Sequence, residues 1–245
     1  MIKPLLIALQ FLTRLPVPNI GEVSDEQVGR SLLFYPVVGL IIGGLLALVA
    51  WLTEGSSDSV RAVLLLIIWT LITGALHIDG LADSADAWVG GYGDKEKTMD
   101  IMKDPYAGPA GVTVILLVLI AKYVSLEVLL SQSNYIILVL VPMLARVMMP
   151  LLLLTTDYVR KNGLGSALAV HHPKCASQWI ILSCGLLTVI VAGSSGVWLL
   201  ATLGIVFLYL RRVMIQRIGG TTGDTLGAMV ELSEAVGLIA LALVI

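Results

Sequence analysis

Long apolar runs separated by short polar segments dominate the pattern of hydrophobic and polar positions along the chain. The hydrocarbon core of a bilayer is about 30 Å thick, so a spanning helix needs roughly 20 apolar residues. The pattern therefore predicts an all-α, polytopic membrane bundle of about seven transmembrane helices. The predicted spans are 31–53, 60–78, 108–130, 134–154, 178–193, 196–210 and 225–245. The fifth and sixth are short, which is typical of a tight hairpin.

A shorter apolar segment, MIKPLLIALQFLTR, precedes the first of these runs. Leu5, Leu9 and Leu12 recur at helical spacing. The segment is too short to cross a bilayer, and prolines follow it. It predicts an N-terminal helix that lies in the membrane interface.

Composition agrees with a membrane protein, because 58% of the residues are hydrophobic, 13% are charged and the mean hydropathy is +0.96. A soluble chain of 245 residues could not bury so much apolar surface. No long polar linker and no internal repeat divides the sequence. We therefore expect residues 1–245 to form a single integral-membrane domain that lies in the lipid bilayer. Assembly into a homo-oligomer is a further possibility.

Basic residues orient the predicted bundle, since cytoplasmic loops carry an excess of Lys and Arg. Twelve of the fifteen fall on alternating loops of one side. They are Lys3, Arg14, Arg30, Lys95, Lys97, Lys103, Arg160, Lys161, Lys174, Arg211, Arg212 and Arg217. This asymmetry predicts a cytoplasmic N-terminus. The net charge of -2 argues against a broad nucleic-acid-binding surface.

Three aspartates follow the second apolar run, in the segment LHIDGLADSADAWVGG, residues 76–91. If a helix passes through this segment, the spacing i, i+4, i+7 places Asp79, Asp83 and Asp86 on one face. Like charges at this spacing repel one another, and no basic residue follows before Lys95. Oxygen ligands of this kind suit Mg²⁺ or Mn²⁺, so the trio predicts a divalent-metal site.

A second acidic cluster lies in GGTTGDTLGAMVELSE, residues 219–234, where the last apolar run begins. Asp224, Glu231 and Glu234 have a spacing that puts them on one helix face. Ionisable groups within a membrane helix usually face a polar cavity or a partner. Both acidic faces begin at the predicted cytoplasmic end, so we expect them to meet there.

Basic and acidic candidates also occur elsewhere along the chain. Lys103 and Asp104 lie in the loop DIMKDPYAGPAG, residues 100–111. Lys103 could hold a phosphate, and Asp104 could accept a proton or bind a second metal, although either could equally be an exposed loop charge. Arg146, inside the fourth run, needs an anionic partner, either a cluster carboxylate or a substrate phosphate.

Carboxylates suited to a divalent metal, few basic residues and a polar site at one membrane interface together favour phosphoryl or phosphonucleotidyl transfer. Such transfer depends mainly on positioning and charge neutralisation. A cation or proton transporter, with Glu231, Glu234 and Arg146 as relay groups, is an alternative. Transporters usually place their ligands near the bilayer midplane, whereas these carboxylates concentrate at one interface.

The segment TGALHIDGLADSADAW resembles the signature of the cobalamin synthase family, the adenosylcobinamide-GDP ribazoletransferases. The likeness extends in order through ALQFLTRLPVP, FYPVVGLIIG, IMKDPYAGPAGV and GGTTGDTLGAMVELSE. A looser likeness links the aspartate motif to the CDP-alcohol phosphotransferases, which make phospholipids. That family's Ala-Arg pair is missing, because Asp83 stands in its place.

The resemblance implies a multi-pass enzyme of the bacterial inner membrane with its active site facing the cytoplasm. Such an enzyme joins adenosylcobinamide-GDP to α-ribazole or its 5'-phosphate, with Mg²⁺ as cofactor, and releases GMP. It further implies that Asp79, Asp83 and Asp86 hold the metal together with Asp224. Asp104 is then the candidate base, and Lys103 and Arg146 are the candidate phosphate contacts.

Overall fold

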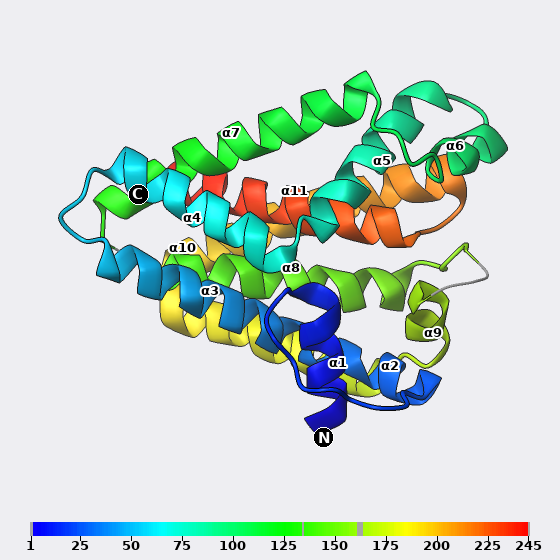
Figure 1. Ribbon diagram of the computed structural model, residues 1–245, viewed down its shortest axis with the longest axis horizontal. Coiled ribbons are helices and arrows are strands. Elements are labelled where there is room, and N and C mark those ends of the chain that lie inside the picture. Colours follow the sequence, from blue (N-terminus) through cyan, green and yellow to red (C-terminus); the bar gives the residue numbers. More distant parts are fainter. Residues whose placement is uncertain (1, 134, 161–163, 245) are drawn as a thin grey trace.

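The computed structural model describes residues 2–133, 135–160 and 164–244, and in these ranges helices are joined by short loops without an extended strand (Figure 1). The predicted all-α membrane bundle is confirmed. Its helices are α1 (Ile2–Leu12), α2 (Asp25–Ser31), a short 3-10 helix (Leu32–Phe34), α3 (Tyr35–Leu52), α4 (Asp58–Thr73), α5 (Leu76–Gly90), α6 (Lys95–Ile101), α7 (Pro109–Ser131), α8 (Ile136–Thr155), α9 (Leu164–Val170), α10 (Lys174–Ile218) and α11 (Gly223–Ala242).

Within the described ranges, five helical units are long and apolar enough to cross a membrane. They are Asp25–Leu52, which runs from α2 into α3, and α7, α8, α10 and α11. The pair α4 and α5 adds a sixth if it is counted as one bent span. The expected number of about seven is reached only when the two arms of α10 are also counted separately.

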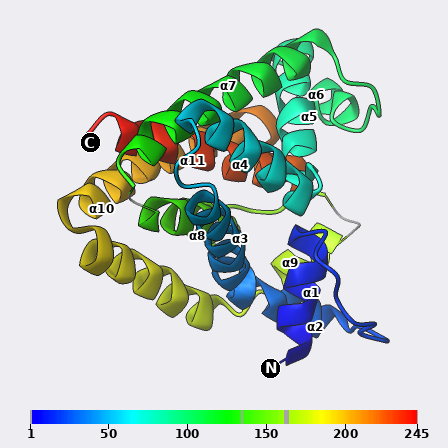
Figure 2. The same cartoon turned by 60° about the vertical axis from the view of Figure 1, so that its left-hand side comes forward.

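The two arms of α10 form the hairpin that the sequence predicts over 178–210. The 45-residue helix leaves helical geometry at Gly193, whose φ of 56° lies in the left-handed region that favours glycine. The chain doubles back there, and the two arms lie in close contact beside the bend. A Cβ added at Gly196 would come within 2.4 Å of the Thr188 carbonyl oxygen. Figure 2 shows the two arms diverging from this bend.

The second predicted span, 60–78, is not one straight helix, and this expectation is wrong. Gly74 and Ala75 both adopt left-handed backbone angles, with φ of 60° and 56°. The axes of α4 and α5 consequently meet at 88°. The loop after α1 packs against this break, where the Arg14 amide donates to the Ile72 carbonyl oxygen at 2.7 Å. As a result α5 begins inside the bundle.

Helix α8 forms the centre of the bundle, and most of its side chains are buried. Gly39 and Gly43 of α3 lie against the α8 backbone, with ideal Cβ positions 2.5 Å from the carbonyl oxygens of Pro142 and Leu138. Small residues four apart are the usual means by which membrane helices approach closely. Outward-facing Leu116, Leu117 and Ile120 on α7 are exposed, as expected for side chains that meet lipid.

The loops with the predicted basic excess gather at one end of the bundle (Figure 1). The turns after α5 and α8, and the end of the second arm of α10, lie at the same end as α2 and α9, opposite the C-terminus. The predicted N-terminal segment is helical as α1 and packs beside α3, where the rings of Phe11 and Tyr35 stack with centroids 6.4 Å apart. One end of the molecule is therefore polar and basic.

We predict that Gly43→Ala lowers the free energy of unfolding by about 1–3 kcal/mol, because its methyl group would meet backbone of α8 that cannot move independently. Gly44→Ala is the matched control, since nothing lies within 4 Å of that Cβ position. Thermal unfolding of both variants in the same detergent checks this. Equal midpoints for the two variants would show that close α3–α8 packing is not limiting.

Candidate active site

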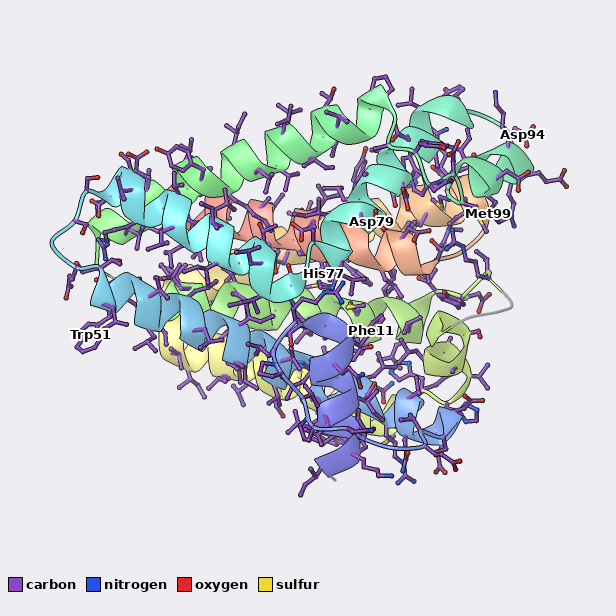
Figure 3. All side chains as sticks on the ribbon, in the orientation of Figure 1. Phe11, Trp51, His77, Asp79, Asp94 and Met99 are labelled. Atoms are coloured by element: carbon purple, nitrogen blue, oxygen red, sulfur yellow. The ribbon has the colours of Figure 1, made fainter. Side chains whose placement is uncertain are left out.

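The three aspartates of α5 lie on one continuous helix, as the sequence predicts. The helix starts at Leu76, directly after the break, and runs outward from the middle of the bundle to the basic end (Figure 1). Figure 3 shows His77 and Asp79 near its inner end, close to the tip of α1 that carries Phe11. The broken backbone therefore places carboxylates along a path from the protein interior to the loops.

Asp86, the outermost aspartate, is bound to the start of α7. Its Oδ2 accepts the Gly108 amide at 2.7 Å, and its Oδ1 accepts the Gly111 amide at 2.9 Å. The first amides of a helix lack partners within the helix, so a carboxylate there satisfies them and complements the helix dipole. Both oxygens of Asp86 thus hold the loop 102–108 in place. Its predicted role as a metal ligand stays a prediction.

Asp79 and Asp224 line the same cavity where α5 crosses α11, and Asp83 lies one turn further along α5. The three carboxylates lie close enough to repel one another. The crossing requires glycine, because a Cβ at Gly80 would come within 2.7 Å of the Asp224 carbonyl oxygen, and Gly227 lies against the backbone of His77. The expectation that the two acidic segments meet holds for Asp224.

Arg160 supplies positive charge to this group of carboxylates. Its Nη2 forms an ion pair with Oδ2 of Asp224 at 2.6 Å, and its charge also acts on Asp83. The sequence singled out Arg160 only as one of many basic loop residues. No local motif marks it, because its place depends on contact between segments that are about 60 residues apart.

A short backbone clamp fixes the segment that carries Arg160. The Thr221 amide donates to the Asp157 carbonyl oxygen at 2.8 Å, and the Val159 amide donates to the Thr221 carbonyl oxygen at 2.9 Å. The Tyr158 hydroxyl oxygen accepts a hydrogen bond from the Gly223 amide at the start of α11. Burial raises the pKa of the Tyr158 phenol, so this group is protonated at neutral pH.

A cavity of about 150 Å³ adjoins the carboxylates on their inner side. Its walls include Phe11, Met149 and His77, and Asp79 and Asp224 reach it from opposite helices. His77 is 2% exposed, and neither of its ring nitrogens has a hydrogen-bond partner within the described part of the chain. The site thus combines a charged rim with a mainly apolar recess.

Glu231 and Glu234 belong to a separate cluster deeper in the bundle. Lys122 of α7 binds both glutamates, with an Nζ to Glu231 Oε2 distance of 2.6 Å, and lies 4.8 Å from the Trp69 ring centroid. Arg146 of α8 pairs with Glu234. All four charged side chains are at least 97% buried. The predicted anionic partner of Arg146 is therefore a carboxylate of the second acidic cluster.

Lys103 and Asp104 lie in the exposed loop between α6 and α7. Lys103 Nζ pairs with Asp100 Oδ1 at 2.9 Å, and Asp104 Oδ1 accepts the Tyr106 amide at 3.1 Å. The structure does not bring either side chain into contact with Asp79, Asp83 or Asp224. Their predicted roles as phosphate contact and base remain predictions.

Comparison with known proteins identifies the family. The family model described as cobalamin-5-phosphate synthase matches residues 4–242. The chain belongs to this family. It is 54% identical over 243 residues to the adenosylcobinamide-GDP ribazoletransferase of Pseudomonas entomophila, with 99% of both chains covered. Proteins of the same name from Pseudomonas putida and Stutzerimonas stutzeri are 50% and 49% identical over 240 residues, with 98% of each chain covered. No solved structure matches the chain.

Membership of the cobalamin-5-phosphate synthase family makes the chain an enzyme and explains why polar groups gather at one end of an apolar bundle. Within the described residues, no three His, Cys, Asp or Glu side chains form a ready-made metal cage. The donor set is nevertheless suited to Mg²⁺, which usually takes one or two protein carboxylates and completes its shell with water and substrate phosphates. Asp79, Asp83 and Asp224 provide such carboxylates.

We predict that Asp86→Ala increases amide hydrogen exchange at residues 108–112, because the first turn of α7 loses two hydrogen bonds. Asp86→Asn keeps one acceptor oxygen and should show a smaller increase. Asp94→Ala is the matched control, since Asp94 caps α6 by accepting the Lys97 amide, and its effect should stay within α6. Unchanged exchange at 108–112 in Asp86→Ala would contradict the capping role.

We predict that Lys122→Met destabilises the protein by about 3–5 kcal/mol, because it leaves two buried carboxylates to share one remaining cation. Lys103→Met removes an exposed ion pair and should change stability by less than about 1 kcal/mol. Unfolding midpoints in nanodiscs check both variants. Similar midpoints would show that the buried cluster contributes little to stability.

Proposed function

We propose that the chain catalyses the ribazole transfer after which its relatives are named. A ribose hydroxyl of α-ribazole, or of its 5'-phosphate, attacks the phosphorus bonded to cobinamide in adenosylcobinamide-GDP. A new oxygen–phosphorus bond forms, the bond from that phosphorus to the bridging oxygen breaks, and GMP leaves with the bridging oxygen. The hydroxyl proton is lost, and the product is adenosylcobalamin or its 5'-phosphate.

The observation that carries the proposal is the meeting of Asp79, Asp83 and Asp224 with Arg160 at the crossing of α5 and α11. Phosphoryl transfer requires that a highly charged group be held and neutralised rather than attacked by a protein nucleophile. Carboxylates for a divalent cation and a guanidinium for phosphate oxygens provide both functions. The family assignment supports this particular substrate pair.

Mg²⁺ is the cofactor that we propose for these carboxylates, with Asp79, Asp83 and Asp224 as the residues that hold it. When bound, it would neutralise phosphate charge and help to orient the diphosphate. The protein positions the carboxylates by the glycine contacts of the α5–α11 crossing. The recess beside His77 and Phe11 gives the inner side of the site mainly apolar walls.

Two further features of the proposal concern the membrane. Because basic loops crowd the end of the bundle that carries the site (Figure 1), we place this end in the cytoplasm of a bacterial cell and the bundle in its inner membrane. Glu231, Glu234, Lys122 and Arg146 bind one another. This mutual pairing supports a structural role for these groups and does not favour the alternative of a proton or cation relay.

We predict that the parent protein in nanodiscs releases GMP from adenosylcobinamide-GDP only when α-ribazole or its phosphate and Mg²⁺ are all present, and that EDTA abolishes release. Asp83→Asn should lower kcat by at least about 100-fold, because removal of a group that positions the reacting phosphate costs this much. Asp25→Asn, an exposed change on α2, is the control and should match the parent.

Three results would contradict this proposal in different ways. Absence of GMP and of a corrinoid product from the parent would refute the transfer itself. Full activity in EDTA would refute the metal requirement. Parent-like kcat in Asp83→Asn would remove this carboxylate from the machinery while leaving the reaction in place.

A further inference from the structure

We propose that Arg160 binds the diphosphate of the nucleotide-activated substrate, and that its ion pair with Asp224 occupies this arginine while the substrate is away. The inference rests on the proposed function and adds a residue and a regulatory contact to the same site. It assigns the phosphate contact to a side chain other than Lys103 or Arg146.

The side chains of Arg160 and Asp224 are partly exposed, although Oδ2 of Asp224, which makes the contact, is itself buried. The two side chains are 26% and 19% exposed, unlike the buried Arg146, so an incoming anion can reach the guanidinium without unfolding the bundle. Its Nη2 also donates to the Met102 carbonyl oxygen at 3.3 Å, and its Nε is buried without a partner in the ranges that the structure describes, which leaves Nη1 as the donor nitrogen for an incoming anion. An arginine has five N–H donors in a planar fork, so donors remain for a phosphate.

Charge balance at the crossing also points to an anion partner for Arg160 in the loaded state. With the substrate away, the single positive charge of Arg160 acts on both Asp224 and Asp83. Asp79 adds a third negative charge that repels these two carboxylates. A divalent cation on these carboxylates would neutralise them and reduce their hold on the guanidinium. A diphosphate that arrives with the cation offers new oxygen acceptors, and charge-assisted bonds to phosphate replace those to carboxylate.

The other basic candidates are already held elsewhere. Arg146 is 0% exposed and is paired with Glu234 below the site. Lys103 is paired with Asp100 in the exposed loop. Arg211 donates to the Thr155 carbonyl oxygen and to Thr156 at the end of α8. Among these residues, Arg160 is the one that contacts a carboxylate of the candidate metal site.

The backbone around Arg160 is built to hold this position. Two backbone hydrogen bonds join residues 157–159 to Thr221. The neighbouring Gly220 also lies against this segment, because a Cβ added there would come within 2.3 Å of the Asp157 carbonyl oxygen. The clamp ends at Thr221, three residues before Asp224, so Arg160 and the first turn of α11 keep a fixed relation. An arginine on a mobile surface loop would lose more conformational entropy on binding phosphate.

The test separates phosphate binding from metal binding in Arg160→Gln, Arg160→Lys and a control, Arg212→Gln, whose side chain is exposed at the same end. Steady-state kinetics with GMP detection give KM for adenosylcobinamide-GDP and for α-ribazole 5'-phosphate. Equilibrium dialysis measures binding of GDP with Mg²⁺, and electron paramagnetic resonance measures binding of Mn²⁺ alone. All proteins are full-length and in nanodiscs.

We expect Arg160→Gln to raise KM for adenosylcobinamide-GDP and Kd for GDP by about 10- to 100-fold, the range for a lost charge-assisted hydrogen bond. KM for α-ribazole 5'-phosphate should change by less than about 3-fold. Mn²⁺ should bind at least as tightly as to the parent, because the carboxylates lose a competing cation. Arg160→Lys should recover part of the loss, and Arg212→Gln should behave as the parent does.

Two results would overturn the inference while leaving the proposed function intact. If the parent protein is active, an unchanged KM for adenosylcobinamide-GDP in Arg160→Gln would refute the proposed contact between Arg160 and phosphate. Parallel loss of GDP and Mn²⁺ binding would show that Arg160 only maintains the fold of the site. If the parent released no GMP, the proposed function would fail, and equal GDP binding by parent and Arg160→Gln would then overturn the arginine contact separately.

Discussion

The cost of leaving a charge unpaired inside an apolar bundle governs the arrangement of this protein. An ionised group buried in hydrocarbon needs a counter-ion or a polar cavity. Lys122, Arg146, Glu231 and Glu234 meet this requirement among themselves and join α7, α8 and α11 at the centre. The carboxylates that lack a full set of cations lie instead at the crossing of α5 and α11, on the part of α5 that leads to the basic end. The same constraint therefore both ties the helices together and separates structural charges from those available for chemistry.

The second determinant of the site is close approach of backbones. The break at Gly74 and Ala75 turns α5 by 88° from α4 and starts it inside the protein. Gly80 and Gly227 then let α5 and α11 cross with their main chains in contact. A site assembled in this way is rigid because its carboxylates extend from packed helices. Rigid placement of charged groups is what phosphoryl transfer demands of a protein.

Arg160 completes this arrangement from a segment that is neither helix nor strand. Two backbone hydrogen bonds to Thr221 bring it beside Asp224. The arginine thereby gives the acidic group a protein counter-charge that a substrate phosphate can compete for. Within one site, α5 and α11 supply carboxylates, the clamp supplies the guanidinium, and the tip of α1 with α8 closes the recess.

The sequence by itself determined the membrane class, the helical bundle, the hairpin near Gly193, the shared face of Asp79, Asp83 and Asp86, and the resemblance to the family. These properties depend on apolar run length, on helical periodicity and on motifs that are local in the chain. Only the tertiary structure decided that Asp86 caps α7, that Arg146 pairs with Glu234, and that Arg160 reaches Asp224. Each is a contact between residues 22 to 88 positions apart, and spacing within one segment cannot specify which distant partner a charged side chain meets.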